Sequence, residues 1–281
     1  MTPTTRLSVP ADSIVIEIGN TAIALDTADA AFRHLLEERY APFLNSSRNV
    51  HSQITIHLIE NPNQGDPTTA EPDEDLQVKM DGSRWILKRG DFSAEWNPAT
   101  GLGSIRQSVN PYSVDTVLRI VHSLILAQEG GFLLHAASAV RGGRAFLFSG
   151  VSGAGKTTIS RLAPSDVILL TDEISYIKPE GGMYRAFGTP FAGELAKLGE
   201  NISAPVSTVF LLEKGPKNRI EPVPPDEAVR KLLRNILFFA EDSELVNLVF
   251  QSACRFCQRV PVRKLIFTPD ERVWEIIGLQ E

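Results

Sequence analysis

A glycine-rich stretch near the middle of the chain carries the residues best suited to chemistry. Within the stretch 150–158, residues 150–157 match the pattern G-x-x-x-x-G-K-[ST], which is typical of a phosphate-binding P-loop. Glycines let backbone N–H groups approach phosphate oxygens, a lysine stabilises the phosphate charge, and a hydroxyl binds Mg²⁺. We therefore expect Lys156 to contact the β- and γ-phosphates of a nucleotide. The predicted nucleotide-binding residues are Gly150, Val151, Ser152, Gly153, Ala154, Gly155, Lys156, Thr157 and Thr158.

Two adjacent carboxylates are suited to complete such a site. Asp172 and Glu173 follow the apolar run 167–170, which is where the metal-binding acid of a P-loop protein is expected. Adjacent side chains at the end of a strand can reach one site, so that one acid binds Mg²⁺ and the other accepts a proton from an attacking hydroxyl. The alternative is a surface Asp-Glu turn without a catalytic role.

A histidine and a third carboxylate are further candidates. His135 lies in the apolar run 132–140, where it either forms hydrogen bonds in the core or borders the phosphates and the catalytic acids. The stretch 188–194 predicts a tight loop that presents Glu194, with a plain turn as the alternative. The predicted metal ligands are Thr157, Asp172 and Glu194.

The segments around these residues predict an α/β fold. The apolar run 144–149 predicts a buried strand before the P-loop, and 157–163 predicts a helix after it, ended by Pro164. The runs 132–140 and 144–149 flank a short Arg-Gly-Gly-Arg turn and predict a β-hairpin, so the sheet should be mixed.

Two further elements are predicted towards the C-terminus. Residues 225–239 carry helical periodicity, with Leu232, Leu233 and Ile236 on the apolar face. Residues 268–271 predict the start of the last helix as a capping box, with a threonine at the N-cap and a glutamate three residues later.

The chain divides by pattern into a front part and a core part. Residues 1–112 predict a small α+β domain, because short alternating runs are separated by turn signals and no catalytic motif occurs. The acidic, proline-containing segment 61–75 predicts a mobile loop within it. Residues 113–281 form the predicted P-loop domain.

Composition narrows the classes of function. The chain has 281 residues and a formal net charge of −6, which gives no support for a nucleic-acid-binding surface. No apolar run approaches the length of a membrane span, and the N-terminus lacks the apolar segment of a signal peptide. Two cysteines cannot form a disulfide framework, so a cytoplasmic protein is expected.

The order of these features resembles the C-terminal kinase domain of the HPr kinase/phosphorylase family, over about residues 130–280. The resemblance implies a P-loop kinase core of the HPr kinase/phosphoenolpyruvate carboxykinase type with a mixed β-sheet. It also implies that His135, Asp172 and Glu173 lie around the transferred phosphoryl group and the metal. The chain departs from the family at Val151, where an aspartate is usual, and at Glu173, where the family has a second aspartate.

We therefore predict a kinase that uses ATP and Mg²⁺ and transfers the γ-phosphoryl group to a hydroxyl of a peptide, protein or small molecule. The alternative is a nucleotide-binding regulatory or assembly protein without phosphoryl transfer. No nucleic-acid or membrane partner is expected, whereas a homo-oligomer is compatible with the sequence. The predicted catalytic residues are Asp172, Glu173, His135 and Lys156.

Overall fold

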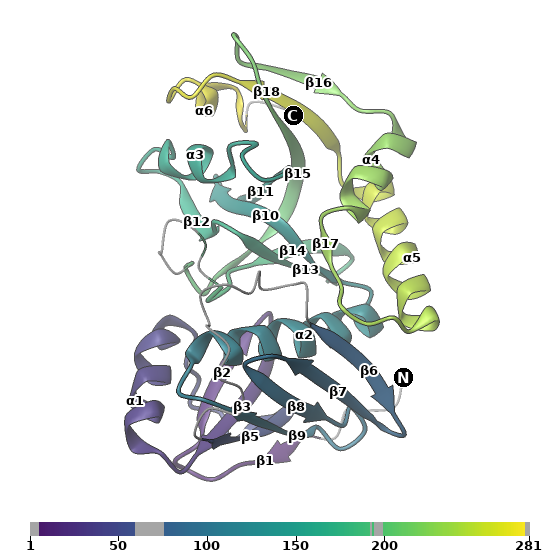
Figure 1. Cartoon of the computed structure of the whole chain (residues 1–281). Helices are drawn as coiled ribbons and strands as arrows, with labels where there is room; N and C mark the ends of the chain where they lie inside the picture. Colours follow the sequence, from purple (N-terminus) through teal and green to yellow (C-terminus); the bar gives the residue numbers. More distant parts are fainter. Residues whose placement is uncertain (1–5, 60–75, 192, 194–198, 279–281) are drawn as a thin grey trace. The chain divides into compact units, whose positions relative to one another are not determined.

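The chain forms two compact units. The computed structural model describes residues 6–59, 76–191, 193 and 199–278 (Figure 1). The first unit contains residues 1–124 and 239–243, and the second contains residues 125–238 and 244–281. The division falls within helix α2 (Pro111–Glu129). The predicted loop 61–75 lies outside the described residues.

The sheet of the first unit is mixed. Among its described residues, seven strands pair in the order β2-β3-β5-β9-β8-β7-β6, in which β3, β5 and β9 run parallel and the other pairs are antiparallel. Burial alternates along β5 and β8, because successive side chains of a strand point to opposite faces. The strands of this unit are β1 (Leu7–Ser8), β2 (Ile14–Ile18), β3 (Thr21–Thr27), β4 (Asn49–Val50), β5 (Ser52–Leu58), β6 (Gln77–Asp81), β7 (Arg84–Arg89), β8 (Phe92–Trp96) and β9 (Leu102–Gln107).

Helix α1 (Ala30–Arg39) is fixed at both ends, and a short 3₁₀ turn η1 (Ala41–Phe43) follows it. Asp29 caps the N-terminus, where its Oδ1 accepts the N–H of Phe32 at 2.8 Å. At the other end Arg39 and Tyr40 both donate to the buried carboxylate of Asp115 in α2. Burial and the neighbouring Asp115 carboxylate raise the pKa of Tyr40 well above its usual range, so Tyr40 remains a neutral donor.

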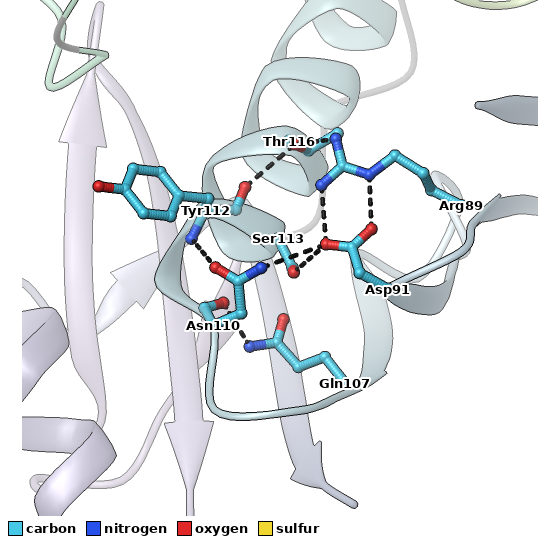
Figure 2. A network of polar contacts seen from close by, with 7 residues as sticks. All are labelled: Arg89, Asp91, Gln107, Asn110, Tyr112, Ser113 and Thr116. Atoms are coloured by element: carbon cyan, nitrogen blue, oxygen red, sulfur yellow. Dashed lines mark hydrogen bonds and ion pairs between the residues drawn. The ribbon is translucent and has the colours of Figure 1, made fainter. Parts of the chain in front are cut away.

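A polar network attaches the first turn of α2 to the β7–β8 hairpin (Figure 2). Arg89 forms a two-pronged ion pair with Asp91, with contacts of 2.5 and 2.8 Å. Ser113 donates to the same carboxylate at 2.7 Å, and the Asn110 amide donates at 3.3 Å. Burial opposes the charge on Asp91, but the contacts from Arg89 and Ser113 outweigh burial and lower its pKa.

Within the residues that the structure describes, nine strands make up the sheet of the second unit. Strands β11, β10, β13, β14 and β15 close into a ring, because β15 pairs with β14 near its start and with β11 further on. Strand β18 pairs in parallel with β15, whereas β10 and β11 form the predicted antiparallel hairpin, so the mixed sheet is confirmed. The strands are β10 (Phe132–Arg141), β11 (Arg144–Ser149), β12 (Ile168–Thr171), β13 (Ile174–Glu180), β14 (Met183–Phe187), β15 (Ser203–Lys214), β16 (Arg219–Pro222), β17 (Ile236–Leu237) and β18 (Val262–Phe267).

Both faces of strand β11 are buried. Ala145 and Leu147 belong to a hydrophobic cluster with residues of α4 (Pro225–Leu233) and α5 (Ser243–Arg259). Phe146 and Phe148 point the other way and pack with residues of α3 (Lys156–Arg161) and α6 (Val273–Ile276). Figure 1 shows these two helix pairs on opposite sides of β10 and β11. A strand covered on both faces has a continuous apolar sequence, as 145–148 does.

Of the helices that the structure describes, none is both long enough and apolar enough to cross a membrane.

Two predictions for the C-terminal part were wrong. The helix predicted at 225–239 ends at Leu233, because residues 236–237 form strand β17 and pair with β10. The capping box predicted at 268–271 does not form, and α6 begins only at Val273. The hydroxyl of Thr268 instead contacts Asn218, from the β15–β16 connection, and the Asp270 carboxylate.

Replacing Asp91 with asparagine should destabilise the first unit. We expect a loss of about 1–3 kcal/mol near neutral pH, because a charged hydrogen-bond acceptor is removed from Arg89 and Ser113. The pKa of Asp91 is lowered by folding. Its carboxylate therefore stabilises the fold fully above the pKa of the unfolded chain, and this stabilisation is lost as the pH falls through the lowered folded value.

Chemical denaturation at neutral and acidic pH measures this effect. The stability difference between wild type and Asp91→Asn should shrink on acidification. Asp81→Asn, at an exposed position at the end of β6, is the matched control and should change little. A difference for Asp91→Asn that is independent of pH would contradict the role given to its charge.

Candidate active site

The glycine-rich loop connects β11 to α3. Gly153 and Gly155 adopt left-handed φ angles of 74° and 111°, which glycine reaches without a Cβ penalty. Successive backbone N–H groups in such a turn form a concave site for anions. The Nζ of Lys156 donates to the carbonyl of Gly150 at 3.0 Å, so the ammonium group lies across this loop.

Aromatic side chains support the loop from behind. The ring of Phe267, the last residue of β18, lies so close to Gly155 that a Cβ at this position would come within 2.6 Å of it. The indole N–H of Trp274 donates to the carbonyl of Ile159 in α3 at 3.1 Å. Trp274 also packs edge-on against Phe148, with 5.5 Å between the ring centroids. The loop conformation therefore depends on β18 and α6.

Asp172 and Glu173 form the turn between β12 and β13, which we call the acid turn. Asp172 is only 5% exposed, whereas an ordinary surface turn would leave the carboxylate in solvent. A buried carboxylate requires hydrogen-bond donors. The backbone N–H of Gly193 donates to Asp172 Oδ1 at 2.9 Å.

Strand β10 brings the acid turn and the glycine loop close together. On one edge β10 pairs with β13 up to His135 and with β12 from Ser138 onward, so the acid turn faces residues 136–137. On the other edge Ser149, the last residue before the loop, pairs with Ala136. Two strand spacings, or about 10 Å, therefore separate the backbone of the acid turn from the end of β11.

The other predicted site residues lie on β10, in α3 and at the tip of the glycine loop. His135 is half-buried and lies on β10 at the level of the acid turn, with its carbonyl accepting the hydroxyl of Ser149 at 3.3 Å. Thr157 and Thr158 follow Lys156 in α3, whereas Val151 is 77% exposed at the tip of the loop. Glu194 lies outside the described residues.

Three residues that support the acid turn were not predicted from the sequence. Thr171 and Gly193 contact the acids, and Thr189 contacts the next residue, Ile174. A threonine directly before two acids at the end of a strand is a signal for a local side-chain-to-backbone turn. The pattern of the stretch 188–194 predicts a loop that presents a carboxylate, and it does not predict the contact of Gly193 with Asp172.

Thr157 and Asp172 offer the hydroxyl and carboxylate oxygens that Mg²⁺ prefers. Within the described ranges no group of three His, Cys, Asp or Glu side chains is arranged to hold a metal ion. Mg²⁺ does not require such a cage, because it usually binds to one or two protein oxygens together with phosphate oxygens and water. The donor types present therefore fit a metal that arrives with a nucleotide.

The second unit is thus a mixed α/β structure with a glycine loop between a strand and a helix. The sequence model of a family described as SynChlorMet cassette protein ScmC matches residues 104–279. Because this match spans more than half of the chain, the protein belongs to the ScmC family. The family that matches is therefore not the HPr kinase family that the sequence resembles.

Curated proteins and solved structures add little information about the function of this chain. No curated protein matches the chain. Among solved structures, the HPr(Ser) kinase/phosphatase from Coxiella burnetii matches with 14% identity and a TM-score of 0.26, covering 48% of this chain and 78% of that one. A similarity of this size carries no argument about the chemistry of the site.

The contact between Gly155 and Phe267 can be tested by adding a single methyl group. Gly155→Ala should lower the melting temperature through left-handed backbone strain and through the clash with the ring. Gly142→Ala is the matched control, because Gly142 is also left-handed, at φ 56°, but has no atom within 4 Å of an added Cβ. Strain alone costs about 1 kcal/mol.

Thermal unfolding of the two variants measures the difference. Gly155→Ala should be less stable than Gly142→Ala by about 1–3 kcal/mol, the usual cost of overpacking. Equal losses in the two variants would show that Phe267 does not constrain the loop.

Proposed function

We propose that this protein is an ATP-dependent kinase that transfers the γ-phosphoryl group to a hydroxyl. The observation that carries the proposal is the arrangement around β10, with the glycine loop and Lys156 beyond one edge and the acid turn beyond the other. Phosphoryl transfer needs this combination, because phosphate charge must be stabilised while a metal and an attacking hydroxyl are held nearby.

The glycine loop and the acid turn would bind different parts of Mg²⁺-ATP. The amides of residues 150–155 and the ammonium of Lys156 would hold the phosphates, and Thr157 and one acid would hold Mg²⁺. Bound Mg²⁺-ATP supplies the activated phosphoryl group. The close approach of the loop and the acid turn along β10 supports this proposal, because a preorganised site needs little reorganisation when its ligand binds.

The acid turn would also accept the proton of the attacking hydroxyl. Asp172 and Glu173 provide two carboxylates on consecutive residues, so one can bind the metal while the other acts as the base. His135 lies on the neighbouring strand at the same level and would tune these acids. The acceptor would be a serine or other hydroxyl of a peptide, a protein or a small molecule.

A nucleotide-binding regulatory or assembly protein without phosphoryl transfer is the second candidate. Two departures from the kinase pattern favour it, Val151 in the loop and Glu173 in the acid turn. Both candidates require binding of Mg²⁺-ATP, and only the kinase requires the acid turn for a chemical step.

Lys156→Ala should weaken the binding of Mg²⁺-ATP by at least about tenfold, because it removes the cation that lies across the loop. Isothermal titration calorimetry of wild type and variant measures this. Lys231→Ala, which removes a partly exposed lysine paired with Glu227 on α4, is the control and should bind like wild type. Unchanged affinity in Lys156→Ala would contradict nucleotide binding at the loop.

Asp172→Asn should slow phosphoryl transfer by about 10²–10⁴-fold, because the amide keeps the size of the side chain but loses its charge and basicity. The amide oxygen can still accept the Gly193 N–H, so the acid turn should keep its shape. Glu173→Gln should also slow transfer, and His135→Ala should cost at most about 10²-fold.

Single-turnover release of γ-phosphate from labelled ATP, with water as the acceptor, measures these rates. Mg²⁺-ATP affinity should fall far less than the rate, because the loop and Lys156 still hold the phosphates. Turnover at the wild-type rate in both acid variants would rule out the kinase mechanism and favour the regulatory protein.

A further inference from the structure

The acid turn is held by side chains that lie outside the predicted set of catalytic residues. Thr171, the last residue of β12, accepts two backbone N–H groups on its Oγ1, from Glu173 and from Ile174, each at 3.2 Å. This local pattern closes the chain around the two acids. Without it, consecutive residues in an extended strand would point their carboxylates to opposite faces.

A second threonine fixes the residue that follows the acids. The hydroxyl of Thr189 donates to the carbonyl of Ile174 at 2.8 Å, so Ile174 is bound through both its N–H and its C=O. Thr171 and Thr189 are 2% and 1% exposed. Solvent has no ready access to these hydroxyls, so water is a poor substitute for either hydrogen bond.

The backbone at Gly193 contacts Asp172 and leaves no room for a side chain beside either acid. Its N–H donates to Asp172 Oδ1, and a Cβ at this position would come within 2.9 Å of both Asp172 Oδ2 and the Cβ of Glu173. The start of the same loop is anchored to β12, where the N–H of Thr189 donates to the carbonyl of Leu170 at 3.2 Å. Thr171 and Thr189 therefore hold the backbone on both sides of the acids, and Gly193 contacts Asp172 itself.

We propose that Thr171 and Thr189 are positioning residues that, with the Gly193 amide, set the direction of the Asp172 and Glu173 carboxylates for phosphoryl transfer. This inference rests on the proposed kinase function. Neither threonine needs to touch the nucleotide, because both act through the backbone of the acid turn. Small errors in the placement of catalytic groups lower the reaction rate strongly, since a misplacement of about 1 Å can slow a reaction about 10²-fold.

Amide hydrogen exchange in the nucleotide-free protein tests the structural part of the proposal. Thr171→Val keeps the shape of the side chain and removes the oxygen, so exchange at the Glu173 and Ile174 amides should accelerate by at least about tenfold. Thr171→Ser retains the oxygen and should restore protection. Thr208→Val, at a buried position on β15, is the control and should leave these two amides unchanged.

Single-turnover γ-phosphate release and calorimetry with Mg²⁺-ATP test the functional part. Thr171→Val and Thr189→Val should each slow release by about 10–10²-fold while Mg²⁺-ATP affinity stays within about threefold of wild type. Thr171→Ser should recover most of the rate. Thr208→Val should retain the wild-type rate even if its melting temperature falls as much as that of Thr171→Val.

The outcomes separate this inference from the proposed function. A wild-type protein that neither binds nor turns over Mg²⁺-ATP overturns the kinase proposal and, with it, the positioning role. An active wild type with Thr171→Val at the same rate overturns the positioning role alone. Slow release in Thr171→Val that serine does not rescue, or that Thr208→Val shares, also overturns it, because such losses report general destabilisation.

Discussion

The candidate site depends above all on the pairing of strand β10 along both of its edges. Its first half pairs with β13 and β17, and its second half pairs with β12 and β11. This exchange of partners occurs around residues 135–138. The end of β11 and the acid turn therefore meet β10 at the same level, although they are more than twenty residues apart in sequence. Backbone hydrogen bonds in a sheet fix such distances closely.

A second constraint comes from the parallel strands β11, β15 and β18. Carboxyl ends of parallel strands lie at one edge of a sheet, and the glycine loop follows β11 at that edge. Phe267 ends β18 there and packs on Gly155, so the position where the loop must turn left-handed is also the position with no room for a side chain. Glycine satisfies both requirements at once, and α6 completes the support through Trp274.

Local patterns in the sequence predicted the local parts of this arrangement. The glycine loop between a strand and a helix, the β10–β11 hairpin and the mixed sheet follow from turn residues and apolar runs that are close in sequence. The apolar pattern of 225–239 predicts a helix where strand β17 forms, because the pairing of β17 with β10 joins residues about a hundred positions apart. The capping box at Thr268 failed for a similar reason, since Asn218 offers that hydroxyl a distant partner.

In the candidate site, too, contacts between residues distant in sequence could not be predicted from local patterns. Asp172, Glu173, His135 and the loop could be named from residue type and spacing, and the structure places them around one strand. The support from Thr189 and Gly193 could not be predicted, because neither residue type signals a contact with residues that lie 15 and 21 positions earlier in the chain. Membership in the ScmC family, which the match over residues 104–279 shows, gives no catalytic role to any of these residues.

The most direct test of the central claim is a crystal structure of the protein with Mg²⁺ and a non-hydrolysable ATP analogue. The arrangement around β10 predicts the β- and γ-phosphates against the amides of residues 150–155 and Lys156. It also predicts the metal between Thr157 and the acid turn. A nucleotide bound elsewhere, or phosphates in the loop with the metal away from both Asp172 and Glu173, would contradict the account.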